Sequence, residues 1–329
     1  MKAWVYERYG SPDDVLGLEE VETPRPGGDQ VLVRVQASGL NAADWHVMRA
    51  DPFLVWLRFG LRRPRRPMIA GCDVAGVVES VGERVTRFSP GDRVFGEVGF
   101  TGGLAEFAAG PGDQLAMMPA DCTFEQAAAI PVSGVTALRA IRDAGRVGPG
   151  TTVLLIGASG GVGTFALQIA RALGGVVTAV CGPAAVELVR SLGAVEVIDY
   201  TAERYVDAGR TYGVVVNNGG THSLGALRRT LTPKGTLAAV GGSQHGGLFG
   251  PGGLAMRGKV VAPFVSQRIV AVEGESNEAD LATLASMIQA GDVTPVIDRV
   301  YPFGETPDAL RYVEDGHPKG KVVVTVRDG

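Results

Sequence analysis

The N-terminal part of the chain carries short runs of apolar and β-branched residues, several of which alternate with polar positions. Examples are residues 31–35, 74–81 and 93–95, each bounded by glycine or proline. A period of two places successive side chains on opposite faces of a strand, and glycine and proline mark the turns between strands. This part of the chain is therefore predicted to be rich in β-structure.

A different pattern begins at Thr123, a predicted helix N-cap with Gln126 as its capping-box partner. From Thr151 onward, apolar strands alternate with amphipathic helices, which is typical of a doubly wound parallel sheet. The predicted strands are 153–156, 176–180, 197–198, 214–216, 236–240 and 260–265, and the predicted helices include 163–173 and 184–192. After a helix at 280–290, strands at 297–301 and 322–326 are expected to rejoin the first domain.

The amino-acid composition restricts the kinds of binding partner that we expect. The 329 residues are 45% hydrophobic and carry a formal net charge of −4, so we expect neither nucleic acid nor an anionic membrane as a partner. No apolar run approaches the roughly 18 residues of a membrane-spanning helix, and the first residues enter a strand-like pattern without a signal-peptide core. A soluble, cytoplasmic protein is the expectation.

The segment that joins strand 153–156 to helix 163–173 reads Gly157-Ala158-Ser159-Gly160-Gly161-Val162-Gly163. Glycines permit positive φ angles and close approach of a ligand, and the N–H groups at the start of a helix attract the negative charge of a phosphate. This order of strand, glycine turn and helix predicts a dinucleotide site. The alternative is a tight turn that binds no ligand.

The end of the second predicted strand bears on the choice of cofactor. NAD-preferring sites place an acidic residue there to hold the ribose 2′-hydroxyl, whereas this chain has Cys181-Gly182. The missing carboxylate favours NADPH, with NADH as the alternative. Tyr200 is a candidate donor to the 2′-phosphate, or else an ordinary tyrosine at a strand end. Pro183-Ala184-Ala185, just after this strand, include no basic side chain to hold the 2′-phosphate, so the preference for NADPH is expected to be weak.

Several motifs together carry a resemblance to a known family. They are GLNAADW at 39–45, GCDVAGVV at 71–78, GDRVFG at 91–96, the glycine turn at 157–163 and GKVVV at 320–324. The chain resembles the zinc-independent, quinone oxidoreductase-like branch of the medium-chain dehydrogenase/reductase superfamily. The resemblance implies an α/β protein: a GroES-like β-barrel catalytic domain at 1–122 and 266–329, and an inserted Rossmann domain at 123–265.

The same resemblance bears on metal binding. Zinc-dependent relatives hold a catalytic metal through a Cys, a His and a second Cys, and the matching positions here are Asn41, Cys72 and Val132. One thiol and no imidazole do not provide three protein ligands, so we predict no metal. Without a Lewis acid, a quinone or an α,β-unsaturated carbonyl is a better hydride acceptor than a simple carbonyl, because it delocalises the negative charge.

The resemblance also assigns site residues. Asn41 is expected beside the nicotinamide, and His46 is a candidate proton donor. The expected cofactor contacts are Asn41, Thr136, Ser159, Gly160, Gly161, Val162, Cys181, Tyr200, Asn218, Gly241, Phe264 and Lys321. The alternatives are a turn asparagine at 41, a helix-packing threonine at 136 and a solvated lysine at 321. Asp44 and Asp73 are expected to orient the site.

The leading hypothesis is an NADPH-dependent reductase of quinones or α,β-unsaturated carbonyls that forms a homodimer. Two alternatives stay open. Arg58, Arg62, Arg63, Arg65 and Arg66 form an exposed loop or else bind an anionic group such as the phosphate of CoA or of a carrier protein, which favours an enoyl-thioester reductase. A cofactor-binding protein without redox turnover is the second alternative.

Overall fold

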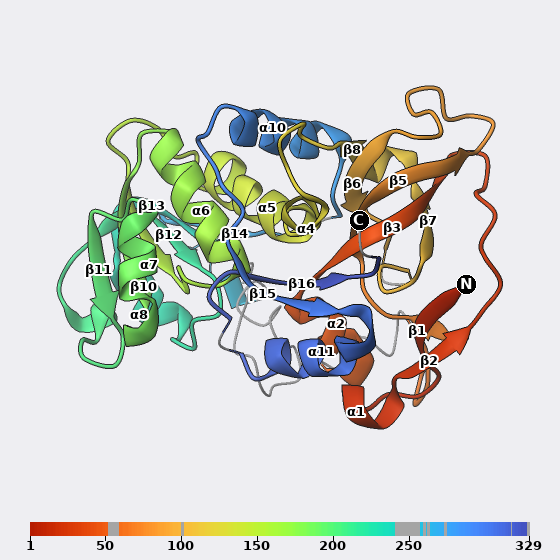
Figure 1. Ribbon diagram of the computed structural model, residues 1–329. Coiled ribbons are helices and arrows are strands. Elements are labelled where there is room, and N and C mark those ends of the chain that lie inside the picture. The colour runs from red at the N-terminus through yellow and green to blue at the C-terminus, as the bar shows by residue number, and fades with distance from the viewer. Residues whose placement is uncertain are drawn as a thin grey trace. The chain divides into compact units, whose positions relative to one another are not determined.

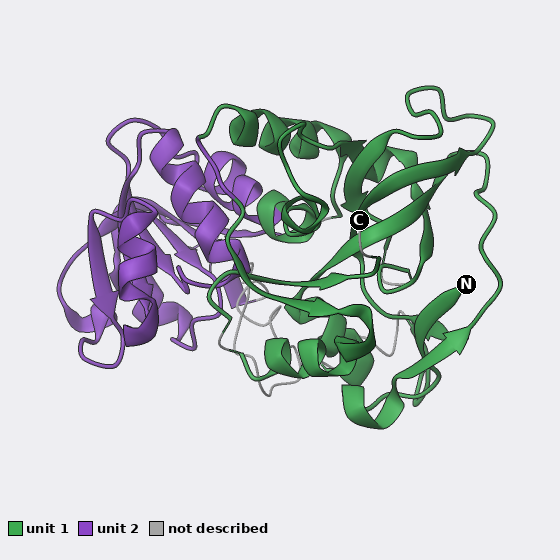
Figure 2. Cartoon of the chain, viewed as in Figure 1, with its two compact units in different colours: residues 1–135, 275–291, 295–329 green, residues 136–274, 292–294 purple. Residues whose placement is uncertain are grey.

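The computed structural model describes residues 1–51, 59–99, 102–240, 257–258, 261, 264–272, 275–316 and 318–327. The chain divides into two compact units, coloured differently in Figure 2. Unit 1 comprises Met1–Val135, Glu275–Gly291 and Pro295–Gly329, and unit 2 comprises Thr136–Gly274 and Asp292–Thr294. Unit 1 is therefore assembled from distant parts of the chain, as predicted for the catalytic domain.

Unit 1 is built on two sheets (Figure 1). A three-stranded antiparallel sheet contains β2 (Gly17–Glu20), β1 (Lys2–Tyr6) and β4 (Met68–Ile69) in that order. A seven-stranded sheet has the order β15-β16-β3-β5-β6-β8, and β7 also pairs with β3. Its strands are β3 (Gln30–Leu40), β5 (Asp73–Val81), β6 (Arg93–Glu97), β7 (Phe107–Pro111), β8 (Leu115–Met117), β15 (Ile297–Pro302) and β16 (Lys321–Thr325).

Unit 2 contains one six-stranded parallel sheet of order β11-β10-β9-β12-β13-β14. Counted from its first strand, this is the order 3-2-1-4-5-6 of a Rossmann fold. The strands are β9 (Thr152–Ile156), β10 (Val176–Cys181), β11 (Glu196–Asp199), β12 (Tyr212–Asn217), β13 (Leu231–Ala239) and β14 (Arg268–Ala271). The predicted fold class, a GroES-like domain with an inserted Rossmann domain, is confirmed.

The helices pack on these sheets, and each of those named here lies within the described residues. They are α1 (Pro12–Val15), α2 (Ala42–Arg49), α4 (Phe124–Ala128), α5 (Pro131–Leu138), α6 (Gly161–Ala172), α7 (Val186–Ser191), α8 (Leu224–Arg229), α10 (Glu278–Gln289) and α11 (Thr306–Glu314). A π-helical turn, Arg139–Ala144, extends α5. The predicted capping box is present, because the side chains of Thr123 and Gln126 accept from each other's backbone N–H.

Two predicted features of the sheet in unit 2 differ from the structure. The strand predicted at 236–240 begins earlier, because β13 runs from Leu231 to Ala239. The last strand of the sheet is β14 at Arg268–Ala271 rather than 260–265, and of the latter segment the structure describes Val261 as helical and Phe264 as 3₁₀.

The division into units also lies at other residues than the predicted boundaries after 122 and after 265. The short helix α4 packs against β3, β5 and β16, all of them strands of unit 1. Unit 1 therefore continues through α4 to Val135, and unit 2 continues through β14 to Gly274.

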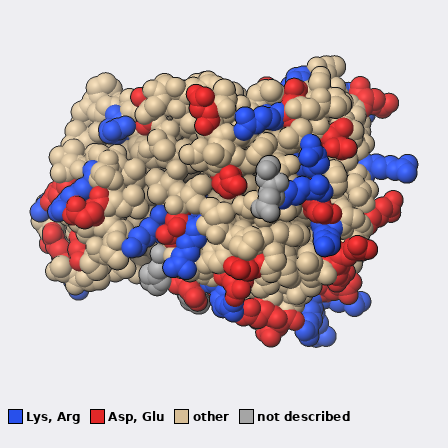
Figure 3. All heavy atoms as spheres, viewed as in Figure 1, with Lys and Arg blue, Asp and Glu red and all other residues tan. Residues whose placement is uncertain are grey.

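Among the described residues, no helix is both long and apolar enough to cross a bilayer. On the face drawn in Figure 3, acidic and basic side chains are interspersed. This agrees with the small formal net charge of −4.

Candidate active site

A cluster of buried polar side chains lies in unit 1, where three strands of the large sheet meet. In the register of this sheet, Gly39 of β3 pairs with Asp73 of β5, and Leu40 pairs with Val322 of β16. Asn41 directly follows β3, and Lys321 is the first residue of β16. The antiparallel pairing of β3 with both neighbours therefore brings Asn41, Asp73 and Lys321 together.

These three side chains contact one another directly. The ammonium of Lys321 donates to Asn41 Oδ1 at 2.7 Å and forms an ion pair with Asp73 Oδ2 at 3.5 Å. Asn41 Nδ2 donates to the same Asp73 oxygen at 2.9 Å. Lys321 is only 2% exposed and Asp73 is fully buried, so the interpretation of Lys321 as a solvated strand-end lysine is wrong.

The three positions that match zinc ligands in zinc-dependent relatives also lie in this cluster. Asn41 Nδ2 lies 3.6 Å from the sulfur of Cys72, and the backbone N–H of Val132 donates to the Asp73 carboxylate at 3.3 and 3.4 Å. Positions 41, 72 and 132 therefore meet around one buried carboxylate. Their side chains are an amide, a thiol and an aliphatic group.

Burial shifts the acid–base properties of the cluster. It raises the pKa of Asp73 to about 7, against the opposing effects of Lys321 and Asn41. It raises the pKa of Asp44 to about 6, although Asp44 Oδ2 accepts a 2.7 Å hydrogen bond from the Asn41 backbone N–H. Burial likewise raises the pKa of the Cys72 thiol well above its usual value, and the neighbouring carboxylates add to the shift. Cys72 is therefore a neutral thiol, whereas metal binding requires a thiolate.

Two further members of the cluster were not singled out from the sequence. The hydroxyl of Ser133 donates to Asn41 Oδ1 at 3.4 Å, and the buried carboxylate of Glu97 accepts from the Ser276 backbone N–H at 2.9 Å. The one indication of Ser133 in the sequence is that it directly follows Val132, a position that matches a zinc ligand of zinc-dependent relatives. Glu97 is the last residue of a predicted strand, and its sequence context carries no signal of a site.

His46, the predicted proton donor, lies in α2, the helix that Asn41 caps. Its ring stacks on Trp45 with 3.7 Å between ring centroids. His46 Nδ1 lies 2.8 Å from the backbone carbonyl oxygen of Asp51, and a carbonyl only accepts, so Nδ1 carries a proton. In the neutral ring, Nε2 is therefore the nitrogen without a proton.

In unit 2, the glycine turn joins β9 to α6. Gly157 has a φ of +74°, and a Cβ there would lie 2.0 Å from the backbone oxygen of Asn218. A Cβ on Gly163 would lie 2.1 Å from the oxygen of Gly157. These two glycines are required by the packing of the turn itself.

The middle of the glycine turn is less tightly packed than Gly157 and Gly163. The middle residues, Ser159 to Val162, are half-buried. Gly160 is the N-cap of the 12-residue helix α6 and, as a glycine, has no side chain that could bond the first N–H groups of the helix. A Cβ on Gly160 would have its nearest neighbour at 3.8 Å. The start of α6 therefore offers space and backbone N–H groups to an anion, as a pyrophosphate requires.

Cys181, Tyr200 and Asn218 lie at the carboxyl ends of β10, β11 and β12. The N–H of Tyr200 donates to the backbone oxygen of Cys181 at 3.2 Å, and Asn218 Nδ2 donates to the backbone oxygen of Gly157 at 3.3 Å. The Tyr200 side chain is 52% exposed, and its hydroxyl lies 3.2 Å from the position of a Cβ on Gly182. The structure thus places the Tyr200 phenol beside Gly182, while the acidic residue at this edge, Asp199, belongs to β11 and pairs with Cys181.

The remaining predicted cofactor contacts are Thr136, Phe264 and Gly241. Thr136 is a half-buried residue of α5, and Phe264 is 85% exposed. Gly241 lies outside the described residues. The structure therefore gives no account of a common role for these three.

Comparison with known proteins shows the family. Residues 27–120 match the alcohol dehydrogenase GroES-like domain, and residues 192–324 match the family described as zinc-binding dehydrogenase. Over 98% of its length the chain is 32% identical to a chloroplast envelope quinone oxidoreductase homolog of Arabidopsis thaliana, of which it covers 98%. The chain belongs to the quinone oxidoreductase-like branch of the medium-chain dehydrogenase/reductase superfamily. It is an oxidoreductase.

Other members of the superfamily are similar over the same length. The chain is 33% identical to the mitochondrial NAD(P)H oxidoreductase RTN4IP1 of Mus musculus, over 99% of this chain and 89% of that one. The structure of the quinone oxidoreductase from Coxiella burnetii has a TM-score of 0.87 and 27% identity, over 99% of both chains. The resemblance inferred from the motifs is confirmed.

Membership of a superfamily with zinc-dependent members raises the question of a zinc site. The matching positions supply one thiol with a raised pKa, an amide and an aliphatic side chain, and the ammonium of Lys321 lies among them. In the part of the chain that the structure describes, no group of three His, Cys, Asp or Glu side chains is arranged to hold a metal ion. These donors do not fit the three-ligand catalytic zinc site of such enzymes.

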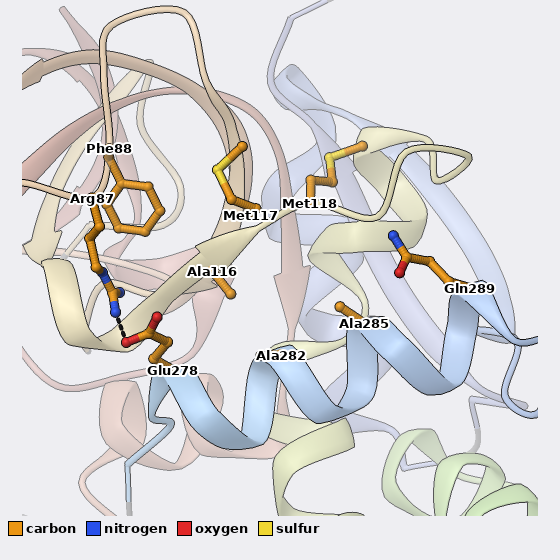
Figure 4. A pocket seen from close by; sticks show the side chains of 9 residues that line it. All are labelled: Arg87, Phe88, Ala116, Met117, Met118, Glu278, Ala282, Ala285 and Gln289. Atoms are coloured by element: carbon orange, nitrogen blue, oxygen red, sulfur yellow. Dashed lines mark ion pairs between the residues drawn. The ribbon is translucent and has the colours of Figure 1, made fainter.

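A hollow of about 310 Å³ lies elsewhere in unit 1, between β8 and α10 (Figure 4). Met117, Met118 and Ala282 are among its lining residues, and Arg87 forms an ion pair with Glu278 at one end. None of the predicted site residues lines it. It is therefore distinct from the two groups of residues described above.

Proposed function

We propose that the chain catalyses the NADPH-dependent, zinc-independent reduction of a quinone or an α,β-unsaturated carbonyl. The observation that carries the proposal is the replacement of a zinc-ligand set by Asn41, Cys72 and Val132 around the Asp73–Lys321 pair. Relatives named as quinone oxidoreductases and as an NADPH-dependent alkenal/one oxidoreductase support the substrate class.

In this proposal unit 2 binds the cofactor. The half-buried residues Ser159 to Val162 at the start of α6 would hold the pyrophosphate, and Tyr200 beside Gly182 would donate to the 2′-phosphate. The bound dihydronicotinamide supplies the hydride. A phenol in place of a carboxylate removes the repulsion that a 2′-phosphate meets in NAD-preferring sites.

Unit 1 provides the polar groups around the substrate. A conjugated acceptor spreads the incoming negative charge onto a distal oxygen, which hydrogen-bond donors stabilise without a Lewis acid. His46 is the proposed proton donor to the resulting enolate, since an imidazole exchanges protons near neutral pH. Because the Asp51 carbonyl holds the Nδ1 proton, the donor is the imidazolium form, which gives its second proton from Nε2 and returns to the neutral ring.

The test is a panel of quinones, enones and enoyl thioesters, with NADPH and NADH oxidation followed by absorbance and zinc measured on the same sample. Turnover of quinones or enones with NADPH preferred, at less than stoichiometric zinc, is the expected result. Tight NADPH binding without turnover of any acceptor would establish the cofactor-binding protein instead. Stoichiometric zinc with oxidation of simple alcohols would refute the proposal.

An enoyl-thioester reductase is the second candidate because Arg62, Arg63, Arg65 and Arg66 are all exposed in unit 1 and available to an anionic group. Faster turnover of enoyl-CoA than of the matching free enone would favour it. Arg58 lies outside the described residues.

The homodimer and the cytoplasmic location also belong to the proposal. The homodimer follows from the resemblance to the family and is checked by sedimentation equilibrium. Cell fractionation checks the location, a necessary test because the relatives named above are mitochondrial or belong to the chloroplast envelope.

A further inference from the structure

We infer that Lys321 is a positioning residue, whose buried ammonium fixes the orientation of the Asn41 carboxamide and supplies the positive charge around which positions 41, 72 and 132 are arranged. The catalytic part of this inference rests on the proposed function. The structural part does not.

The orientation of Asn41 follows from the chemistry of its two neighbours. An ammonium only donates hydrogen bonds, and a carboxylate only accepts them. Lys321 lies 2.7 Å from Asn41 Oδ1, and Asp73 Oδ2 lies 2.9 Å from Asn41 Nδ2. Rotating the amide by 180° would turn its NH₂ toward the ammonium and its oxygen toward the carboxylate. The ammonium therefore enforces this orientation, and Asp73 enforces the same one when it is ionised.

The charge balance of the cluster gives Lys321 its second role. Three carboxyl groups, those of Asp44, Asp73 and Glu97, are buried near Cys72 and act on one another electrostatically. Lys321 opposes the effect of burial on both Asp44 and Asp73. Removing one partner of a buried ion pair leaves an uncompensated charge, which is strongly destabilising.

The Lys321 ammonium also explains how positions 41, 72 and 132 are held together without a metal ion. Val132 donates its backbone N–H to Asp73, Asn41 donates its amide to Asp73, and Cys72 precedes Asp73 in the chain. The carboxylate thus connects all three positions, and Lys321 neutralises it. A divalent cation placed here would be repelled by a positive charge that belongs to the protein.

The experiment compares Lys321→Met, Asp73→Asn and the double variant, with Lys319→Met as the control. Lys319 is an exposed lysine two positions away that uses only its backbone N–H, which donates to Asp298. The readouts are the denaturation midpoint, the NADPH dissociation constant and kcat with the best acceptor of the panel.

Lys321→Met is expected to lower the denaturation midpoint and to lower kcat by about tenfold to a hundredfold, because a displaced site group costs that much. NADPH affinity should stay within about twofold, since the phosphates bind unit 2. In the double variant the denaturation midpoint should return most of the way to the wild-type value, because no buried charge is left without a partner. Its kcat should stay low, because nothing holds the Asn41 amide in one orientation. Lys319→Met should match wild type in all three readouts.

A double variant that recovers kcat together with stability would overturn the positioning role, and so would an unchanged kcat in Lys321→Met. The orientation is also tested without turnover, by hydrogen exchange of the ¹⁵N-labelled Asn41 side-chain amide, assigned with Asn41→Ala. Slow exchange in wild type and faster exchange in Asp73→Asn/Lys321→Met supports the inference. Equal exchange in both proteins contradicts it, even if the chain proves inactive on every acceptor.

Discussion

Lys321 Nζ lies 2.7 Å from Asn41 Oδ1, although the two residues are 280 positions apart in the sequence. The contact exists because β16 pairs antiparallel with β3, so that the first residue of one strand lies beside the residue that follows the other. The side chain of the N-cap residue of α2 is thereby held by a charge from the other end of the chain. The predictions below test this contact and the two groups of residues around it.

Asn41→Asp should destabilise the protein more than Asn41→Ala. The new carboxylate oxygen takes the place of Nδ2, 2.9 Å from Asp73 Oδ2, so two buried acceptors face each other. We expect an extra loss of about 1–3 kcal/mol in the free energy of unfolding at pH 8, measured by chemical denaturation. The difference should shrink at pH 5, where one carboxyl is protonated. Equal losses at both pH values would contradict the contact.

The stability of the wild-type protein should fall as the pH rises from about 4 to 7. Burial raises the folded-state pKa of Asp73 from 3.8 to about 7 and that of Asp44 from 3.8 to about 6. In this window the folded state retains protons that the unfolded state has released, so raising the pH favours unfolding by up to about 1.4 kcal/mol per pH unit for each group.

Urea denaturation at several pH values measures this slope. Asp73→Asn should flatten it, most clearly between about pH 5 and 7. As a control, Asp14→Asn changes an exposed carboxylate and should leave the slope unchanged. A wild-type stability that rises across the same window would contradict the assignment of these two pKa values.

Tyr200→Phe should weaken NADPH binding by about tenfold and leave NADH binding unchanged, because the hydroxyl is proposed to donate to the charged 2′-phosphate. The Tyr200 hydroxyl lies near Gly182, at the end of β10, where NAD-preferring sites carry an acid. Fluorescence titration with both cofactors measures the effect. An equal loss for the two cofactors would assign Tyr200 to the packing of the strand end.

Two glycines of the turn should respond differently to alanine. Gly163→Ala places a Cβ 2.1 Å from the oxygen of Gly157 and should lower stability by about 1–3 kcal/mol together with cofactor affinity. Gly160→Ala places its Cβ in ordinary contact, 3.8 Å from the oxygen of Gly157, and should lower affinity alone. Gly148→Ala, with nothing within 4 Å, should change neither. Thermal unfolding and NADPH titration distinguish the three, and an unchanged affinity in Gly160→Ala would argue against a phosphate at this turn.

His46→Ala should lower enone turnover by about a hundredfold if the imidazole donates the proton. NADPH affinity should not change. A variant that keeps full turnover would leave water as the proton donor.

The fold was predictable from the sequence because its signals are local. The alternation of strands and helices after Thr151 and the capping box at Thr123 and Gln126 both depend on residues close together in the chain. The strand β14, Arg268–Ala271, was not predicted, since four residues that begin with an arginine carry little pattern. Its place at the sheet edge depends on its pairing with β13.

The candidate site was predictable only in part. The glycine turn carries its own signal, and the family motifs indicated Asn41, Cys72, Asp73 and Lys321 one by one. Nothing in the sequence indicated that Lys321 is buried, because lysine is ordinarily exposed and the pairing of β16 with β3 joins distant segments. The ion pair with Asp73 is thus a property of the strand register.

The discontinuity of unit 1 has a consequence for how the protein folds as it is made. Residues 1–135 leave the ribosome long before β16, and the whole of unit 2 is synthesised between them. Until β16 arrives, residues 37–40 of β3 have no strand partner on one side, and the carboxylate of Asp73 has no cation beside it. We therefore expect the nascent N-terminal segment to remain incompletely folded and dependent on chaperones, while unit 2 acquires its parallel sheet first.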